Sequence, residues 1–460
     1  MASRQGGTLS GFTPLSTPNA PTGLSVSTSI GSATVSFTAP TDTGDGAVTS
    51  FIVTAIDEST GASSGATGSA SPITVSPGGG TFKIRAQAVN GFGPGRLTEF
   101  STGNAIFSGQ ELYTWGNNSY GRLGQNDRID RSSPVQVGAL TTWSTLSHYT
   151  QAIAVTTAGE LYGWGYNLTG NIGLNDTISR SSPVQIGALN NWAVTSSGQV
   201  NLAVKTDGTL WAWGRQNFTG AVGDNTIVNK SSPVQIGALT NWSKVASGVN
   251  TSFAITTGNV LYAWGSNEHG RLGDGTVVHR SSPVQIGALT NWLQVAGGGG
   301  QTVSVKTDGT LWSWGNNGNG ELGSDTVIRR SSPVQVGALT NWSQVSCGDD
   351  FSLAVKTDGT LWSWGANSTG KLGDNTVVAK SSPVQIGSLT WARVAAFKGH
   401  ALAIKSDGTI WAWGYSAHGA LGDDTTARRS SPVQIGAGSS WATIGVGGHS
   451  EFSSALDGVI

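Results

Sequence analysis

One five-residue pattern recurs seven times in this 460-residue chain and restricts its fold more than any other feature. Each copy contains an aliphatic residue, an aromatic residue, a small residue, tryptophan and glycine. The copies begin at Leu112, Leu161, Leu210, Leu261, Leu311, Leu361 and Ile410. A second pattern, SSPVQ, recurs every 49 or 50 residues, with its proline at Pro134, Pro183, Pro233, Pro283, Pro333, Pro383 and Pro432. Such a chain must fold as a series of similar units that cover one another's apolar faces.

Each unit contains about four strand-like segments. In one copy these are Val334–Gly337, Trp342–Gly348, Phe351–Thr357 and Thr360–Gly365. Asp358–Gly359 separates the last two segments, and Asp-Gly is a favoured two-residue hairpin turn because it tolerates positive φ. Four strands in a period near 50 residues predict an all-β fold of the propeller type.

The two ends of the repeat array complement each other. The array starts with Glu111–Gly116, a Trp–Gly strand without a preceding partner. It stops at Ser453–Ile460, where an earlier copy would continue into such a strand. Together the two ends complete one blade, and closure removes the exposed edges of an open array. We therefore predict a seven-bladed β-propeller over residues 107–460, closed by its N- and C-terminal strands.

The aromatic residues of the repeats have two candidate roles. In each copy the aromatic residue and the tryptophan lie at i and i+2 on one strand face, with a small residue between them on the other face. All 18 tryptophans fall at repeat positions. Because aromatic side chains dominate buried cores, we interpret them as packing between blades. A surface platform that stacks on sugars is the alternative.

The first hundred residues follow a different pattern, since every tryptophan lies at Trp115 or beyond. Short alternating runs occur at Ala33–Phe37, Thr49–Ala55, Pro72–Val75 and Phe82–Ala88, separated by Gly, Pro and Asp clusters. This pattern predicts a small antiparallel β-sandwich.

The segments APTGLSVS, ATVSFTAP, GAVTSFIVTA and SPITVSPGGGTFKIRAQAVNGFGPG resemble a fibronectin type III domain. The resemblance covers residues 18–106 and leaves residues 1–17 as an N-terminal tail. Many members of that family carry a tyrosine, whose hydroxyl ties a corner, where this chain has Phe82. The resemblance therefore implies the sandwich without that hydrogen bond. No Arg-Gly-Asp triplet is present, so integrin binding is not implied.

The repeat GELGSDT…SSPVQVGALTNWSQVSCGDDFSLAVKTDGTLWSWG resembles those of the regulator of chromosome condensation family. The similar features are Gly–x–Leu–Gly, in GRLG, GELG, GKLG and GALG, and the terminal Trp–Gly–x–Asn; GNIG at Gly170 and GAVG at Gly220 depart by hydrophobic replacements. The resemblance covers residues 111–460 and implies a seven-bladed propeller. It implies little about activity, because relatives include a guanine nucleotide exchange factor and β-lactamase inhibitor proteins.

Composition excludes several classes of function. Charged residues make up 11% of the chain and its net charge is −1, which predicts no general attraction to nucleic acid. The start of the sequence lacks the apolar core of a signal peptide, and no run approaches the about 18 apolar residues of a membrane span. We expect no membrane insertion. The single cysteine, Cys347, excludes an intramolecular disulfide.

A basic residue precedes every Ser–Ser–Pro: Arg131, Arg180, Lys230, Arg280, Arg330, Lys380 and Arg429. These residues could form a basic ring for an anionic partner. We favour ion pairs within each repeat, because acids recur in step with them at Asp176, Asp224, Asp274, Asp325, Asp374 and Asp423.

Neither a metal site nor a catalytic site is predicted. The Asp/Asn loops lack the acid-rich pattern of a calcium loop, and turn formation explains them better. The histidines are His148, His269, His279, His400, His418 and His449, without any zinc-binding motif. His148, His400 and His449 follow the second strand segment of their repeats, where we expect solvated loop side chains that could converge on one face. We expect no enzyme activity and no cofactor.

The loops vary while the framework repeats, as in binding proteins built on rigid scaffolds, although drift also produces such variation. We expect specificity to reside in two sets of loop residues. The set after the second strand segment contains Tyr149, Asn250, Asp349, Asp350, Lys398, His400 and His449. The set after the Trp–Gly strand contains Tyr120, Phe218, His269 and His418.

The sequence favours a non-enzymatic recognition or structural protein. Low charge, Gly/Ser/Thr richness and a sandwich spacer favour a bacteriophage virion component such as a fibre, tail or head decoration, located in the virion or on an extracellular surface. Its partners would be other virion or surface proteins, contacted through the N-terminal domain, and a host receptor or glycan. One alternative is a cytoplasmic propeller that acts on a partner protein, as an exchange factor or inhibitor does. Another is a lectin.

Overall fold

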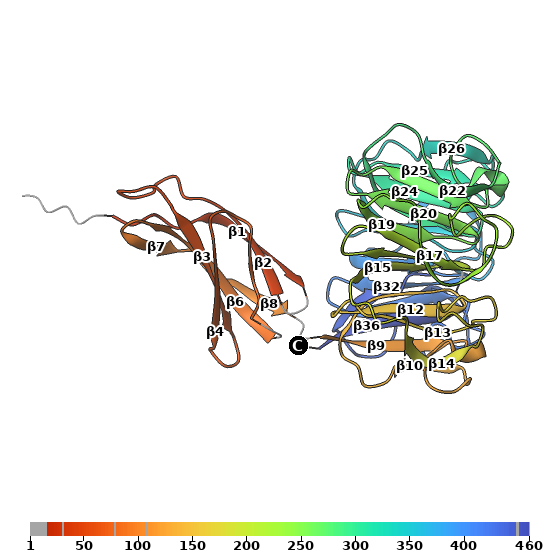
Figure 1. The fold of residues 1–460 in the computed structure, drawn as a ribbon, viewed down its shortest axis with the longest axis horizontal. Coiled ribbons are helices and arrows are strands. Elements are labelled where there is room, and N and C mark those ends of the chain that lie inside the picture. The colour runs from red at the N-terminus through yellow and green to blue at the C-terminus, as the bar shows by residue number, and fades with distance from the viewer. Residues whose placement is uncertain (1–15, 30–31, 78–79, 107–108, 448–449, 460) are drawn as a thin grey trace, which may run out of the picture. The chain divides into compact units, whose positions relative to one another are not determined.

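The computed structural model describes residues 16–29, 32–77, 80–106, 109–447 and 450–459. The chain divides into two compact units (Figure 1). The smaller comprises residues 1–109 with 459–460, and the larger comprises Gln110–Gly458.

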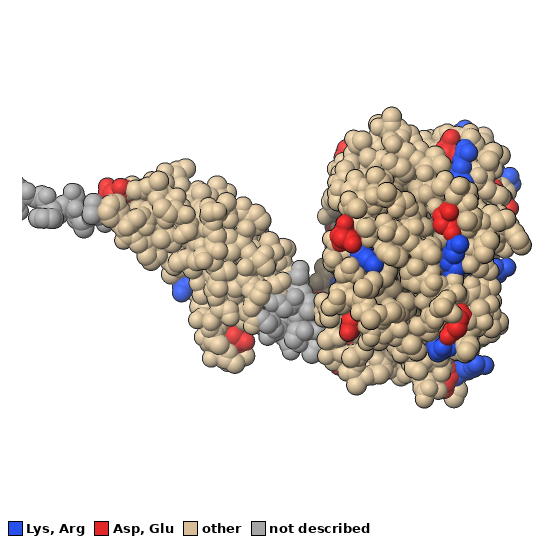
Figure 2. Space-filling view, in the orientation of Figure 1, with Lys and Arg blue, Asp and Glu red and all other residues tan. Residues whose placement is uncertain are grey.

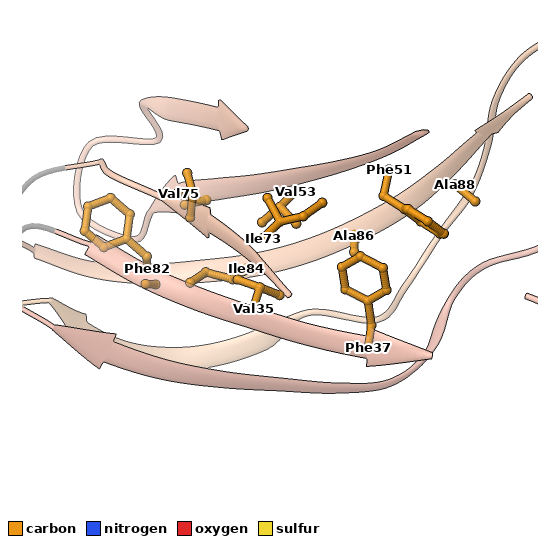
Figure 3. Packing of buried hydrophobic residues seen from close by; sticks show 12 residues of the cluster. Val35, Phe37, Phe51, Val53, Ile73, Val75, Phe82, Ile84, Ala86 and Ala88 are labelled. Atoms are coloured by element: carbon orange, nitrogen blue, oxygen red, sulfur yellow. The ribbon is translucent and has the colours of Figure 1, made fainter. Parts of the chain in front are cut away.

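The smaller unit is a β-sandwich. One sheet has the order β1-β2-β5, from strands β1 (Thr22–Ser29), β2 (Ser32–Thr38) and β5 (Ile73–Val75). The other has the order β4-β3-β6-β7, with β8 also paired to β6; its strands are β3 (Ser50–Asp57), β4 (Ser63–Gly68), β6 (Gly80–Asn90), β7 (Gly93–Leu97) and β8 (Ser101–Ile106). Alternate residues of β2, β3 and β6 are buried and fill the space between the sheets (Figure 3). Phe37 and Phe51 pack there with ring centroids 5.0 Å apart.

The described strands of the larger unit form seven antiparallel sheets of four strands. We name the strands by their order in each sheet. Inner strands begin at the recurrent Trp: β11 (Trp143–His148), β15 (Trp192–Ser197), β19 (Trp242–Ser247), β23 (Trp292–Gly297), β27 (Trp342–Cys347), β31 (Trp391–Ala396) and β35 (Trp441–Ile444). Second strands are β12 (Gln151–Thr156), β16 (Val200–Lys205), β20 (Thr251–Thr256), β24 (Gln301–Lys306), β28 (Phe351–Lys356), β32 (His400–Lys405) and β36 (Phe452–Val459).

Third strands carry the Trp–Gly pattern: β9 (Gly109–Gly116), β13 (Leu161–Gly165), β17 (Leu210–Gly214), β21 (Leu261–Gly265), β25 (Leu311–Gly315), β29 (Leu361–Gly365) and β33 (Ile410–Gly414). Outer strands are β10 (Arg131–Gln136), β14 (Arg180–Gln185), β18 (Lys230–Gln235), β22 (Arg280–Gln285), β26 (Arg330–Gln335), β30 (Lys380–Gln385) and β34 (Arg429–Gln434). The outer strand thus begins at the basic residue, earlier than the expected VQVG segment. Two single-turn 3₁₀ helices, η1 (Ser119–Gly121) and η2 (Glu268–Gly270), lie in loops.

One sheet combines both ends of the array. Its order is β10-β9-β36-β35, so strands from the beginning and the end of the larger unit pair side by side. Gly116, at the end of β9, lies against Phe452, at the beginning of β36. The first inner strand also reaches the last, since Ser147 and Val446 form a parallel bridge.

The tryptophans of the third strands are the core between sheets, as predicted. All are fully buried: Trp115, Trp164, Trp213, Trp264, Trp314, Trp364 and Trp413. Each indole N–H donates to a backbone carbonyl of the preceding sheet's loop; Trp314 Nε1, for example, donates to Arg271 O at 3.0 Å. A Cβ on Gly273, whose φ is +83°, would lie 2.7 Å from that nitrogen. This contact explains why the last glycine of the Gly–x–Leu–Gly pattern recurs.

The other aromatic residue of the third strand is half-buried, and its ring contacts side chains of its own sheet. Where it is Trp, a lysine at the end of the second strand covers it: Lys306 Nζ lies 3.5 Å from the centroid of Trp312. Where it is Tyr, as at Tyr162 and Tyr262, the second strand ends in threonine. These rings therefore serve packing and cation–π contacts within the framework rather than a sugar platform.

Candidate functional site

The variable loops all leave the sheets at the same end. Inner and third strands run in the same direction, so the loops that follow them emerge together. The contact is direct, because Ser266 N donates to Asn250 O and Ala366 N to Asp350 O, each at 2.8 Å. We call this surface the loop face. It comprises the inner loops, 149–150, 198–199, 248–250, 298–300, 348–350 and 397–399, and the outer loops, 117–130, 166–179, 215–229, 266–279, 316–329, 366–379 and 415–428.

The two predicted sets of binding residues therefore share one face. Tyr149, Asn250, Asp349, Asp350 and Lys398 lie in inner loops, and Tyr120, Phe218, His269 and His418 lie in outer loops. His449 lies outside the described residues.

A charged cluster joins inner loops that are distant in sequence. Lys398 Nζ donates to Glu451 Oε1 at 2.7 Å, and this bond raises the pKa of Lys398. Burial raises the pKa of Tyr149, opposed by its hydrogen bond with Gln199 and supported by the nearby negative charge of Asp349. Loops from separate repeats thus place two carboxylates, an ammonium group and a phenol within electrostatic range of one another.

The outer loop 366–379 adds a second positive group below the surface. Lys371, which is buried, lies 5.3 Å from the Phe351 ring centroid. Burial lowers the pKa of Lys371, while Asp350 and Asp349 act in the opposite direction. The two aspartates therefore help to keep this buried ammonium charged.

The outer-loop residues are more exposed, and three adopt left-handed backbone conformations. The φ angles are +66° at Tyr120, +61° at Phe218 and +68° at His269. Phe218 is 81% exposed. His418 Nδ1 lies 2.9 Å from Asp130 Oδ2, which connects the outer loops of the last and first repeats.

The expectation of a solvated, loop-bound His400 is wrong, and the same holds for His148. His400 begins β32 and His148 ends β11, and both are buried. Phe397 stacks between them, with centroids 5.3 Å from His148 and 4.7 Å from His400. His400 Nε2 lies 2.8 Å from Ser453 Oγ. Both histidines are buried because aromatic rings and the sheet that combines both ends of the array surround them.

Acid should weaken this histidine cluster. Burial lowers the pKa of both histidines to about 3, with the positive charges of His400 and Arg122 adding to the effect at His148 and Glu451 opposing it at His400. Unfolded histidines bind protons below about pH 6.5, so stability is complete above that pH and is lost as the pH falls toward 3. We expect a loss of about 1.4 kcal/mol per histidine for each pH unit, measured by urea denaturation.

The variant His148→Phe should remove about half of this pH dependence, because phenylalanine keeps the ring stack and does not titrate. The matched control is His279→Asn, since the equivalent Asn229 makes the same hydrogen bond to the loop backbone. An unchanged slope in His148→Phe would contradict the assignment.

The basic residues before Ser–Ser–Pro form the expected ion pairs in five repeats. The pairs are Arg180–Asp176, Lys230–Asp224, Arg280–Asp274, Lys380–Asp374 and Arg429–Asp423. Arg131 pairs with Asp127. Figure 2 shows acidic and basic side chains side by side on the larger unit.

The expected partner Asp325 was wrong for Arg330. Asp325 has φ +57° and occupies the turn position of Asn225, while Ser324 occupies the position of the pairing acid. The described residues show no ion pair at Arg330. The prediction failed because Asp325 lies one residue after the position of the pairing acid.

A cavity of about 300 Å³ between inner strands was not predicted from the sequence. It is lined by the inner strands β15, β19, β23 and β27. Lys244 Nζ donates to Leu293 O at 2.5 Å and Gln294 Nε2 to Val345 O at 3.2 Å, so polar side chains on its wall tie neighbouring strands together. Burial raises the pKa of Cys347, on the same wall, to about 12. The sequence feature that could have indicated this cavity is the second residue after each recurrent Trp, which varies between repeats and includes Lys244 and Gln294.

In the part of the chain that the structure describes, no group of three or more His, Cys, Asp or Glu side chains could hold a metal ion. No helix among the described residues is long and apolar enough to cross a membrane.

Repeated four-stranded sheets with their variable loops on one face define a repeated-blade protein of the β-propeller type. The RCC1-like domain model matches residues 192–455, and the regulator of chromosome condensation (RCC1) repeat model matches residues 110–148 and 158–199. The chain belongs to the RCC1-like domain family. No curated protein matched it.

Solved structures agree on the fold. Human WBSCR16 has 19% identity and a TM-score of 0.68, over 76% of this chain and 99% of that one. Yeast RCC1 (Prp20), solved bound to Kap60, has 18% identity and a TM-score of 0.68, over 76% and 89%. Prp20p from Saccharomyces cerevisiae has 19% identity and a TM-score of 0.69, over 76% and 92%.

Proposed function

We propose that this chain is a non-enzymatic interaction module whose loop face binds a partner protein. The observation that carries the proposal is the convergence of Tyr149, Asp349, Lys398 and Glu451 from different repeats. A repeated framework presents similar surfaces, so an asymmetric partner is recognised through residues that break the repetition. Yeast RCC1, which has a similar fold, forms a complex with another protein, Kap60.

We further propose that the seven sheets are the blades of one closed propeller. The shared sheet β10-β9-β36-β35 and the Ser147–Val446 bridge support closure. The smaller unit would be a fibronectin type III-like sandwich that serves as a spacer or anchor. Its three-stranded sheet opposite a sheet of order β4-β3-β6-β7 supports that interpretation.

The acids and bases of the loop face support binding rather than catalysis. Lys398 bonds to Glu451, and His418 lies within bonding distance of Asp130. The Lys398–Glu451 ion pair presents fixed charges to a partner. Complementary fixed charges determine orientation and partner choice more than total affinity.

Photo-crosslinking in the source cell tests the proposal. A photoreactive amino acid at position 250, on the loop face, should give protein adducts; at position 235, on outer strand β18, it should not. The adducts should be lost in Lys398→Glu/Glu451→Lys, which keeps the ion pair but reverses its direction. Adducts of equal strength at both positions, or adducts that survive the charge exchange, would exclude the loop face.

If the captured protein is a small GTPase, nucleotide release measured with purified proteins then distinguishes an exchange factor from a passive binder. An exchange factor should accelerate release, and the charge-exchanged variant should not.

A virion component in the same interaction role is the second candidate, located in the particle or on an extracellular surface rather than in the cytoplasm. Low charge and the attached sandwich favour it. Mass spectrometry of purified virions against host fractions decides the location, and recovery only from the cytosol would reject the virion role.

A further inference from the structure

One outer loop breaks the repeat by an insertion. Five residues lie between Gly214 and Gly220, whereas four lie between Gly165 and Gly170 and between the corresponding glycines of the other repeats. The longer loop carries Phe218, which is 81% exposed. The backbone is left-handed at Asn217, with φ +46°, and at Phe218, with φ +61°.

The Phe218 ring gains little contact with the described chain from this conformation, because most of it is exposed. A bulky residue in the left-handed region is strained, and an exposed ring gains no burial. Asparagine and glycine tolerate such a backbone far better than phenylalanine does. Strained conformations of this kind concentrate at binding sites. A contact with another molecule would therefore explain the conformation of Phe218.

A shallow pocket of about 410 Å³ lies beside Phe218. Its walls combine two aromatic rings with planar polar groups and include Tyr166, Arg215, Asn217, Phe218, Ile227 and Asn229. Tyr120, from the preceding outer loop, supports Tyr166 edge-on, with ring centroids 5.0 Å apart at 85°. We call this pocket the rim site.

The polar groups of the rim site are held in place with donors to spare. Arg215 Nη2 donates to Asn217 Oδ1 at 3.3 Å, and Asn229 Oδ1 accepts from Gln216 N at 2.9 Å. The Arg215 bond uses one of the five N–H donors of a guanidinium, and the Asn229 bond uses the amide oxygen rather than the two amide N–H donors, so several donors face a ligand. Fixed planar donors next to an aromatic ring match adjacent hydroxyl groups on a ring that has an apolar face.

We propose that the rim site binds a carbohydrate, with one sugar ring against Phe218 and its hydroxyls facing Arg215 and Asn229. An apolar peptide fits less well, because much of the pocket wall is polar. The inference goes beyond the proposed protein partner, which the inner loops would contact.

The test uses the full chain and a panel of immobilised oligosaccharides built from glucose, galactose, mannose, N-acetylglucosamine and N-acetylneuraminic acid. Wild-type protein should bind at least one of them. Phe218→Gly should bind at least about tenfold more weakly, because the stacking ring is lost. Its melting temperature should equal or exceed that of the wild type, since glycine relieves the backbone strain.

Two controls separate stacking from general loss of surface. Phe218→Trp should retain binding, and Leu168→Ala, which removes another exposed apolar side chain from the adjacent outer loop, should leave it unchanged. The Lys398→Glu/Glu451→Lys variant should also bind the sugar normally, which separates this site from the protein partner.

Three results would overturn the proposal: no oligosaccharide bound by the wild type, equal binding by Phe218→Gly, or Phe218-dependent binding only to an immobilised peptide panel. The last would make the rim site a peptide site.

Discussion

Deleting residues 111–116 should abolish the cooperative unfolding transition of the larger unit. This segment forms most of β9, which lies between β10 and β36 in the sheet shared by both ends of the array. Its loss removes Trp115, a fully buried side chain, and exposes two strand edges that can pair with other molecules. Circular dichroism during thermal denaturation and light scattering should show a broad transition and aggregation.

The repeats themselves provide a matched control for the deletion. Replacing residues 111–116 with TLWSWG, copied from residues 310–315, should preserve folding, because it restores the apolar residues and the Trp–Gly end of the strand. If the deletion melts as sharply and at the same temperature as wild type, closure through β9 does not stabilise the fold.

Trp314→Ala should lower the free energy of unfolding by about 3 to 5 kcal/mol. The substitution leaves a cavity between two sheets and removes the donor of the bond to Arg271 O. Val327→Ala, at an exposed position of the loop that follows this strand, should change the free energy by no more than about 0.5 kcal/mol. Urea denaturation of both variants measures the difference, and small, similar effects would place the indole outside the core.

The strands and core of the larger unit were predictable because seven copies of one pattern indicate the same structure, whereas a single copy does not. A single LWSWG segment is compatible with several environments, but seven copies in step with SSPVQ require faces that cover one another. The burial of Trp314 and its equivalents follows from that pattern. The recurring Gly273 position also follows, once a Trp of the next sheet is placed against it.

The loop predictions failed where the burial of a side chain depends on residues that are distant in sequence. His400 follows a glycine-containing loop and looked exposed, yet Phe397 and Ser453, the latter on the closing strand, enclose it. Asp325 differs from a pairing acid by one position. The joining of the two loop sets on one face could have been deduced, because antiparallel order sends the ends of first and third strands the same way.

The position of β9 also determines how the molecule bears mechanical load. It is the first strand after the sandwich, so tension between the sandwich and the loop face enters the larger unit along this strand's axis. Its neighbours β10 and β36 lie on both sides, and their hydrogen bonds would be sheared together instead of being opened one after another. Tension between the chain's own termini would instead separate β9 from β36 at their adjoining ends, one bond at a time. We therefore expect this sheet to resist tension applied at the loop face more strongly than tension that parts its two ends.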